Sequence, residues 1–317
     1  MDAREIAQKS GIPEAVIREK FGVYRKAIPG PEDTTSHMGI VAAHRALAAA
    51  QLKASEIDLV VWCGAQHKDY PCWLAGLSVA HEIGAMRAWS FDMEAMCGSM
   101  MVAIDTVKSM MMTKKNLQNV LIVSGYRNGD LINFNETSTS FMFDLGAGGA
   151  AVVLQKGYPH NIVLESAFRG DGSFATDCHI PVLGTAQWPP APDDVHNAYF
   201  HVPNPESFKT KLVERTMPNF YAVIRESLNE SGLNDDAIDY LAILHFKRSA
   251  HEAVLQELGL SPDQTTYLEE YGHVGQNDQI LSLELGIQSG KISTGHNIVL
   301  VGAGLGFVWA ATVIQWG

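Results

Sequence analysis

The stretch RALAAAQLKASEIDLVV (Arg45–Val61) returns later in the chain as RESLNESGLNDDAIDYL (Arg225–Leu241), and this repeat decides the fold. Each copy has an amphipathic helix pattern, a Leu, a short polar turn and an Ile-Asp pair that leads into an apolar strand. Ile57 and Ile238 occupy the same place in the two copies. The repeat indicates that the chain contains the same helix–turn–strand unit twice.

Two further pairs of segments follow in the same order. KKNLQNVLIVSG (Lys114–Gly125) corresponds to KISTGHNIVLVGAG (Lys291–Gly304), and FDLGAGGAAVVL (Phe143–Leu154) corresponds to VGAGLGFVWAATV (Val301–Val313). The members of the last pair are closer together in the sequence, so the first half carries an insertion, which we place around Tyr126–Ser140. Three ordered pairs indicate a duplicated unit.

The strands of both copies are near-continuous apolar runs, as is typical of sheets with buried parallel strands. We therefore predict an α/β fold in which two mixed-sheet halves form layers and share helices. The halves are expected at residues 1–157 and 158–317, and no low-complexity linker separates them. The segment Thr185–Pro205, rich in Pro and aromatic residues, predicts a surface loop.

Composition excludes several function classes. The 317 residues include 23 Lys and Arg against 35 Asp and Glu, a net charge of −12, which argues against a nucleic-acid groove and against an anionic membrane surface. Four cysteines without a CxxC pair favour a reducing, cytoplasmic location. The start of the chain, Met1–Gly11, has no signal-peptide pattern. The apolar run Val299–Trp316 is interrupted by glycines, so it predicts two buried strands rather than a membrane span.

Cys97 is the candidate nucleophile. It lies between a short apolar stretch (Ala88–Phe91) and a helix pattern that runs to about Met112. This position predicts a strand-to-helix turn, where free backbone N–H groups and the positive end of the helix dipole favour a thiolate. Cys63, in the apolar run DLVVWCGA, is expected to be a buried structural cysteine.

The repeat also selects two of the 12 histidines. When Cys97 is carried across the repeat by the spacing of Asn119 and Asn297, it lands in YGHVGQNDQ, which contains His273. His245 follows the strand LAIL, at a strand end where α/β sites are usually built. A thiol and two imidazoles at these positions suit a thiolate nucleophile with two proton or hydrogen-bond donors. We expect solvated or capping roles for four other histidines: His179, His196, His201 and His251.

Together these segments resemble the thiolase-superfamily condensing enzymes, and most closely β-ketoacyl-acyl-carrier-protein synthase III. The resemblance runs nearly end to end, and its specific segments are FDLGAGGAAVVL and GAGLGFVWA. It implies a layered αβαβα thiolase-like fold, a homodimer and no cofactor beyond coenzyme A thioesters. No HxH, HExxH or CxxC pattern points to a metal site.

By this resemblance Cys97 is the acyl-accepting nucleophile and His245 the first active-site histidine. The backbone N–H groups of Cys97 and Gly306 would form the oxyanion hole. His273 stands where the family's synthase III members carry asparagine, which implies that it acts chiefly as a neutral hydrogen-bond donor.

Three positions depart from the family. The usual His-Gln-Ala-Asn run is HFKR here, Val16 replaces a tryptophan that stacks on the adenine of coenzyme A, and Thr137 replaces its arginine partner. Coenzyme A recognition would then have to use other cations, and the candidates are Lys20, Arg25, Lys247 and Arg248. A specialised biosynthetic enzyme, for example in a polyketide pathway, is as compatible with these changes as a primer of fatty-acid synthesis.

The leading hypothesis is therefore an acyltransferase that performs a decarboxylative Claisen condensation. Its substrates would be an acyl-CoA and malonyl-CoA or malonyl-carrier protein, and the negative charge favours free coenzyme A as the carrier. A second hypothesis is a condensing enzyme that does not decarboxylate, similar to 3-hydroxy-3-methylglutaryl-CoA synthase, with Glu94 or Asp69 as base. That relative could instead pass the acyl group to an alcohol or amine. A third is a catalytically silent partner subunit.

Overall fold

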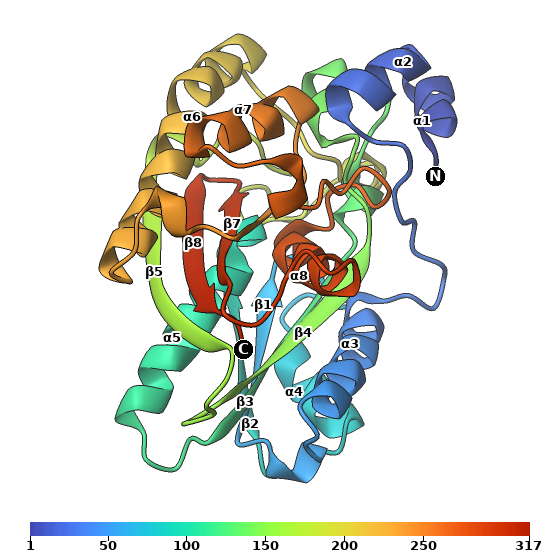
Figure 1. Cartoon of the computed structure of the whole chain (residues 1–317). Coiled ribbons are helices and arrows are strands. Elements are labelled where there is room, and N and C mark those ends of the chain that lie inside the picture. Colours follow the sequence, from blue (N-terminus) through green and yellow to red (C-terminus); the bar gives the residue numbers. More distant parts are fainter.

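Two four-stranded mixed sheets form the body of the molecule (Figure 1). The structure is a computed structural model, which describes residues 1–317 apart from the side chain of Val195. The first sheet has the order β2-β1-β3-β4 and consists of β1 (Leu59–Gly64), β2 (Trp89–Glu94), β3 (Asn119–Tyr126) and β4 (Gly148–Gln155). The second has the order β5-β8-β7-β6 and consists of β5 (Ile162–Gly170), β6 (Tyr240–Ile243), β7 (Asn297–Gly304) and β8 (Val308–Gln315).

Helices cover and separate the sheets. α5 (Ser99–Thr113) and α8 (Asp278–Gln288) lie between them, and α5 contacts strands of both. The outer face of the first sheet carries α3 (Thr35–Ala49) and α4 (Ala75–Glu82). The outer face of the second carries α6 (Pro205–Glu230) and α7 (Arg248–Leu258) (Figure 1). The predicted αβαβα layers are confirmed.

The duplication is visible in matching hydrogen bonds. In the first half the Asp58 carboxylate accepts the Asn119 N–H at 3.0 Å, where β3 begins. In the second half the Asp239 carboxylate accepts the Asn297 N–H at 2.8 Å, where β7 begins. Each aspartate belongs to the repeated Ile-Asp pair, and its side chain aligns the start of the neighbouring parallel strand. The Ile-Asp pair is therefore repeated because it fixes strand register.

The two halves differ in their connections. β3 and β4 are joined by a long segment with two short turns, η4 (Asn128–Leu131) and η5 (Thr137–Met142), where the insertion was predicted. β7 and β8 are joined directly by a tight antiparallel turn, so the apolar run near the C-terminus does form two buried strands. None of the helices in the part of the chain that the structure describes is long and apolar enough to cross a bilayer.

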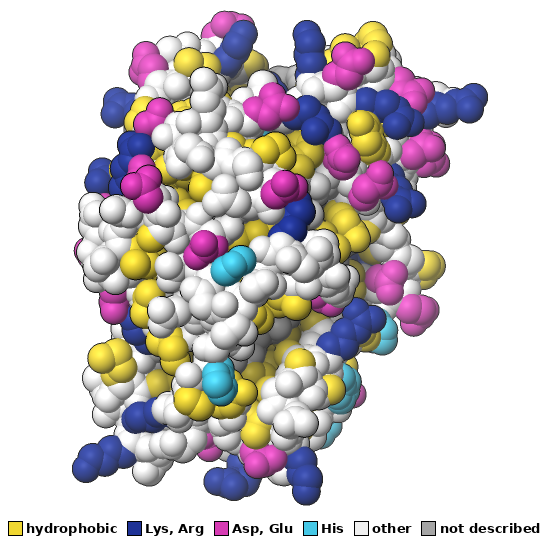
Figure 2. Space-filling view, in the orientation of Figure 1, with side chains coloured by type: hydrophobic (Ala, Val, Ile, Leu, Met, Phe, Trp, Pro, Cys, Tyr) yellow, Lys and Arg dark blue, Asp and Glu magenta, His cyan; other side chains and the backbone are white. Residues whose placement is uncertain are grey.

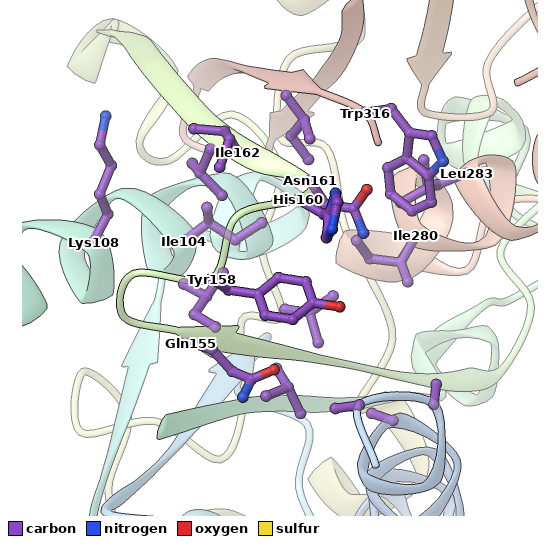
Figure 3. Close-up of a pocket in the computed structure, with 18 of the residues that line it drawn as sticks. Ile104, Lys108, Gln155, Tyr158, His160, Asn161, Ile162, Ile280, Leu283 and Trp316 are labelled. Atoms are coloured by element: carbon purple, nitrogen blue, oxygen red, sulfur yellow. The ribbon is translucent and has the colours of Figure 1, made fainter. Parts of the chain in front are cut away.

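Each sheet has one strand without a counterpart in the other half, β2 in the first sheet and β5 in the second. β5 pairs antiparallel with the outer edge of β8, whereas β4, which corresponds to β8, pairs only with β3 in the first sheet. A groove of about 840 Å³ runs along β4, between α3 on one side and α5 and α8 on the other (Figure 3). Its lining includes the apolar side chains of Ile104, Ile280, Leu283 and Trp316 (Figure 3). Figure 2 shows hydrophobic side chains along this hollow, with charges of both signs scattered over the rest of this face.

The first residues cross to the other half. α1 (Ala3–Ser10), α2 (Glu14–Val16) and the π-helix η1 (Ile17–Phe21) pack into the hydrophobic core that contains α6 and α7. The Tyr24 N–H donates to the Glu269 carbonyl oxygen at 2.7 Å. The chain passes from the first sheet to the second between β4 and β5. The residues before α3, however, pack against the half that contains the second sheet. The division into 1–157 and 158–317 as domains stays a prediction.

Candidate active site

Cys97 lies in a short 3₁₀ turn, η3 (Met96–Gly98), between β2 and α5. The residue before it, Met96, has a φ of +49°, a left-handed conformation that costs free energy for a non-glycine residue. The Ser99 hydroxyl holds this turn, because it donates to the Met96 carbonyl at 2.6 Å and accepts the Ala95 N–H at 2.8 Å. The predicted strand-to-helix turn is therefore present, with the thiol partly exposed at the start of α5.

A strand of the other half closes over this turn. A Cβ on Gly304, at the end of β7, would lie 2.5 Å from the Ala95 carbonyl oxygen and 2.9 Å from the Cys97 nitrogen. Only glycine permits so close an approach. Gly306 follows in the turn between β7 and β8 and has a φ of +131°. The oxyanion hole formed by the N–H groups of Cys97 and Gly306 stays a prediction, and both groups belong to segments that meet here.

His273 is the imidazole that faces the thiol. Its Nε2 lies 3.2 Å from the Cys97 Sγ, and its Nδ1 lies 2.5 Å from an Asp278 carboxylate oxygen. The Asp278 carboxylate is fully buried and also accepts the backbone N–H groups of His245 and Val274, each at 2.7 Å. The carboxylate is thereby fixed as an acceptor, so the Nδ1 of His273 carries a hydrogen.

The charge around His273 favours its protonated form. Burial alone would lower the pKa of His273, but the Asp278 carboxylate and the Cys97 sulfur outweigh burial and raise that pKa well above its usual value. The neutral donor expected from the family's asparagine stays a prediction, and these two charges act against it. An imidazolium beside the sulfur stabilises a thiolate, as in cysteine hydrolases.

His245 is buried close by but its ring points elsewhere. Its Nδ1 lies 2.8 Å from the Asp144 carboxylate, and its Nε2 lies 3.1 Å from the Gly22 carbonyl oxygen. Both neighbours are acceptors, so only a ring with hydrogens on both nitrogens satisfies both. The structure brings Cys97 and His273 together, and it connects His245 to them through Asp278 rather than through its ring.

The N-terminal end of α8 holds this arrangement in place. Four consecutive polar side chains there are buried: Gln276, Asn277, Asp278 and Gln279. Gln276 donates to the Ser124 hydroxyl of β3 at 2.6 Å, and Gln279 donates to the Val301 carbonyl of β7 at 2.9 Å. Both sheets therefore fix the helix end that carries Asp278, which keeps the carboxylate and the imidazole in register.

The four predicted substrate-binding cations lie in different surroundings. Lys247 is exposed and lines a small hollow with Phe21, Phe141 and Asp144. Arg248 is paired with Glu269. Arg25 is paired with Glu270 at 2.6 Å. Lys20 is exposed. The hollow that Lys247 lines also includes Asp144, the partner of the His245 ring.

The candidate bases lie outside the Cys97–His273 pair. Asp69 accepts hydrogen bonds from Thr35 and Ser36 at the start of α3. Burial acts to raise the pKa of Asp69, but these hydrogen bonds lower it overall. Glu94 is exposed at the end of β2.

Sequence reasoning missed two buried aspartates and a lysine. Asp278 stands five residues after His273, in a polar run that opens an apolar helix, and that placement was the available signal. Asp144 precedes the glycine-rich start of β4 and contacts a histidine far away in the sequence. Lys26 is buried and donates to the Leu145 carbonyl at 2.7 Å, and burial lowers its pKa to about 8. The expected solvated role of His251 is also wrong, since that side chain is buried.

Comparisons with known proteins indicate the family to which the chain belongs. Residues 91–172 match the family model for 3-oxoacyl-[acyl-carrier-protein] synthase III, and residues 228–316 match the model for its C-terminal part. A beta-ketoacyl-[acyl-carrier-protein] synthase III of Neisseria meningitidis serogroup B is 27% identical over 98% of this chain and 93% of its own length.

Solved structures show the same fold. The synthase III of Thermus thermophilus has a TM-score of 0.85 at 20% identity and covers 100% of this chain and 95% of that one. Xanthomonas campestris OleA, solved with bound lauric acid and lauroyl-CoA, has a TM-score of 0.83 at 17% identity over 100% of this chain and 95% of that one.

The fold and the cysteine–histidine pair define an acyltransferase of the thiolase superfamily. Within that class, the chain belongs to the 3-oxoacyl-[acyl-carrier-protein] synthase III family.

Proposed function

We propose that the protein joins an acyl group, carried on Cys97, to the carbanion left when a malonyl thioester loses carbon dioxide. The product is a β-ketoacyl thioester. The observation that carries this proposal is the pair formed by the Cys97 Sγ and the His273 Nε2, 3.2 Å apart, with Asp278 fixed behind the ring. A covalent acyl-Cys97 intermediate divides the formation of the carbon–carbon bond into two easier steps, acylation and condensation.

Acylation uses the thiolate. Cys97 attacks the carbonyl carbon of the acyl thioester, and two backbone N–H groups, those of Cys97 and Gly306, stabilise the tetrahedral oxyanion. The leaving thiolate of the carrier takes a proton from the site or from solvent. The acyl group then occupies the Cys97 sulfur and the carrier leaves.

Condensation uses positive charge and N–H donors. As the malonyl thioester loses carbon dioxide, negative charge develops on its thioester oxygen, and the His273 imidazolium stabilises that enolate. The His245 Nε2–H is the second donor in this proposal. In the structure it is donated to the Gly22 carbonyl oxygen, so an enolate oxygen would have to replace that contact. The carbanion attacks the acyl carbonyl and Cys97 leaves as a thiolate.

The acyl donor is proposed to be a coenzyme A thioester, with no further cofactor. The malonyl unit is carried by coenzyme A or by an acyl carrier protein, and the family's name includes the second of these. Lys247 borders the hollow beside Asp144, which makes it the proposed contact for a carrier phosphate. The net charge of −12 disfavours an acidic protein carrier and favours free coenzyme A.

The protein is further proposed to be a cytoplasmic homodimer. Its four cysteines are free, as suits a reducing compartment. Large apolar side chains are exposed on and beside α4 and the edge strand β2, and a second copy would cover them: Tyr70, Leu74, Leu77 and Trp89. Light scattering after gel filtration measures the assembly, and a monomer would contradict this part of the proposal.

The decisive experiment follows the carboxyl carbon. With malonyl thioester labelled at its free carboxyl group and an acyl-CoA, the protein should release labelled carbon dioxide and form a β-ketoacyl thioester. Parallel reactions with malonyl-CoA and malonyl-carrier protein identify the carrier. Cys97→Ala should form no acyl-enzyme and no product. Acylation of Cys97 without carbon dioxide release from either malonyl thioester would overturn the proposed function.

A further inference from the structure

Three side chains of this site, those of Cys97, His273 and Asp278, contact one another in sequence. The Cys97 Sγ, the His273 ring and the Asp278 carboxylate are linked by contacts of 3.2 Å and 2.5 Å. They come from η3, from the loop before η10 (Gly275–Asn277), and from the first residue of α8. This order of nucleophile, imidazole and carboxylate is the arrangement with which hydrolytic acyl-transfer enzymes activate a nucleophile.

The carboxylate decides what a neutral His273 can do. Two backbone N–H groups already occupy Asp278, and its remaining contact goes to the Nδ1 of His273. With the Nδ1 hydrogen held there, a neutral ring has its lone pair on Nε2, directed at the Cys97 sulfur. A carbanion has no proton to give to that lone pair. A water molecule or an alcohol has one.

We propose that the same site has a second activity, the transfer of the acyl group from Cys97 to a protic oxygen nucleophile, which is hydrolysis when that nucleophile is water. This inference rests on the proposed function only in that it needs the acyl-Cys97 intermediate. His273 is the general base of the step, and Asp278 is the residue that positions it.

The step balances without any other reactant. His273 Nε2 takes the proton of the attacking water while the water oxygen bonds to the acyl carbon. The tetrahedral intermediate then expels the Cys97 sulfur as a thiolate, so a carboxylic acid is released. The thiolate and the His273 imidazolium that remain are the pair from which acylation began. The net reaction converts an acyl-CoA and water into a fatty acid and coenzyme A.

Protonation of His273 sets the balance between the two activities. The protonated ring stabilises an enolate, and the neutral ring accepts a proton, so transfer to water should rise as pH rises. The titratable groups that face the ring are Cys97 from η3, Asp278 from α8 and Tyr126 from β3. The Asp144–His245 pair lies behind Asp278. Tyr126 stays neutral, because burial first and the neighbouring Cys97 second raise its pKa well above the usual value.

The test measures loss of the acyl group from Cys97 without any malonyl thioester. The enzyme is acylated with an acyl-CoA, freed of small molecules, and followed by intact mass in water enriched in ¹⁸O. Wild-type protein should release a carboxylic acid that contains one ¹⁸O, and added alcohol should divert part of it to an ester. Asp278→Asn and His273→Ala should slow this release by about 100-fold or more.

Controls separate the possible failures. Asp92→Asn removes another carboxylate that accepts two backbone N–H groups, those of Ala75 and Gly76, and that pairs with Lys68, and it should not slow the release. The wild-type rate measured against pH should follow a single titration; a flat profile, or a rate that Asp278→Asn leaves unchanged, would overturn the inference. Failure of Cys97 to be acylated at all would instead overturn the proposed function. Should Asp278→Asn fail to fold, the wild-type pH profile and ¹⁸O incorporation still decide.

Discussion

At the scale of single residues, the four cysteines differ in their surroundings. Cys63 is fully buried in β1, and burial raises its pKa far above the usual value. Burial also raises the pKa of Cys178 to about 12. Cys97 is partly exposed and lies beside an imidazole, whereas Cys72 is exposed in a loop. Only two thiols should therefore react, that of Cys97, which has His273 beside it, and that of Cys72, which is exposed.

We expect limiting iodoacetamide to modify Cys97 before the other cysteines, with loss of activity in proportion. The reason is that His273 stabilises the thiolate, which is the reactive form. Peptide mapping after partial labelling measures the order. Cys72 is the internal control for exposure, and its preferential labelling with activity intact would contradict the prediction.

His273 offers a sharper distinction. If its positive charge stabilises the enolate, His273→Asn should be as defective as His273→Ala, each with about 100- to 1,000-fold slower carbon dioxide release. Asparagine supplies an N–H donor but cannot hold a charge. Steady-state release of labelled carbon dioxide from both variants measures this. A substantial recovery in His273→Asn would show that a neutral donor is sufficient.

At the scale of elements, α7 packs on the core through His251, which has no hydrogen-bond partner. The His251 side chain is buried, neither of its ring nitrogens has a hydrogen-bond partner, and the ring packs against Phe246 and Tyr267. Burial, with help from the charges of His245 and Arg248, lowers the pKa of His251 to about 4. The neutral ring is therefore the form that fits the packed helix.

This packing should make the protein sensitive to acid. The unfolded chain binds a proton at His251 near its ordinary pKa of about 6.5, and the folded chain does so only near pH 4, so stability is lost as pH falls between these values. The loss from pH 7.5 to pH 5 is on the order of 2 kcal/mol. Urea unfolding of His251→Phe should show a smaller loss, whereas the exposed control His44→Phe should behave as wild type. Equal acid sensitivity in all three proteins would contradict the assignment.

Sequence predicted the elements better than the contacts between them. The repeated Ile-Asp pair and the position of Cys97 are local patterns, and both led to the right strands and the right turn. The acceptors of His245 and the role of Asp278 depend on which loops meet after folding. Gly22 and His245 are 223 positions apart in the sequence, so nothing in the local sequence around His245 indicates where its ring points.

At the scale of the whole molecule, the first half has one core of its own, between its sheet and α3 and α4, and the other two cores combine side chains of both halves. The cluster around α5 combines side chains from β1 and β3 with side chains from β6, β7 and β8. The N-terminal helices pack on the second sheet, and Gly304 of β7 closes over the turn that carries Cys97. The two copies are therefore joined by shared packing.

Fragments that end or begin at the repeat boundary should not fold alone. Residues 1–157 would lack α8 and the second sheet, against which α5 packs, and residues 158–317 would lack α5 and the N-terminal helices that complete their core. We expect both fragments to be unfolded or aggregated by circular dichroism and one-dimensional NMR, while the intact chain unfolds in one calorimetric transition. A fragment with a cooperative transition of its own would contradict this expectation.

The open edge of β4 should give the two copies of the repeat different rates of amide hydrogen exchange. β8 lies between two strands, so the amide hydrogens on both its sides are held in ladders, whereas those on the outer side of β4 have no strand to bind. In heavy water, the outward amides of β4 should therefore exchange orders of magnitude faster than those of β8, although both strands belong to the same duplicated hairpin. Hydrogen exchange followed by mass spectrometry would measure the two rates in the same molecule. Equally slow exchange in both strands would mean that another segment or molecule covers the outer edge of β4 in solution.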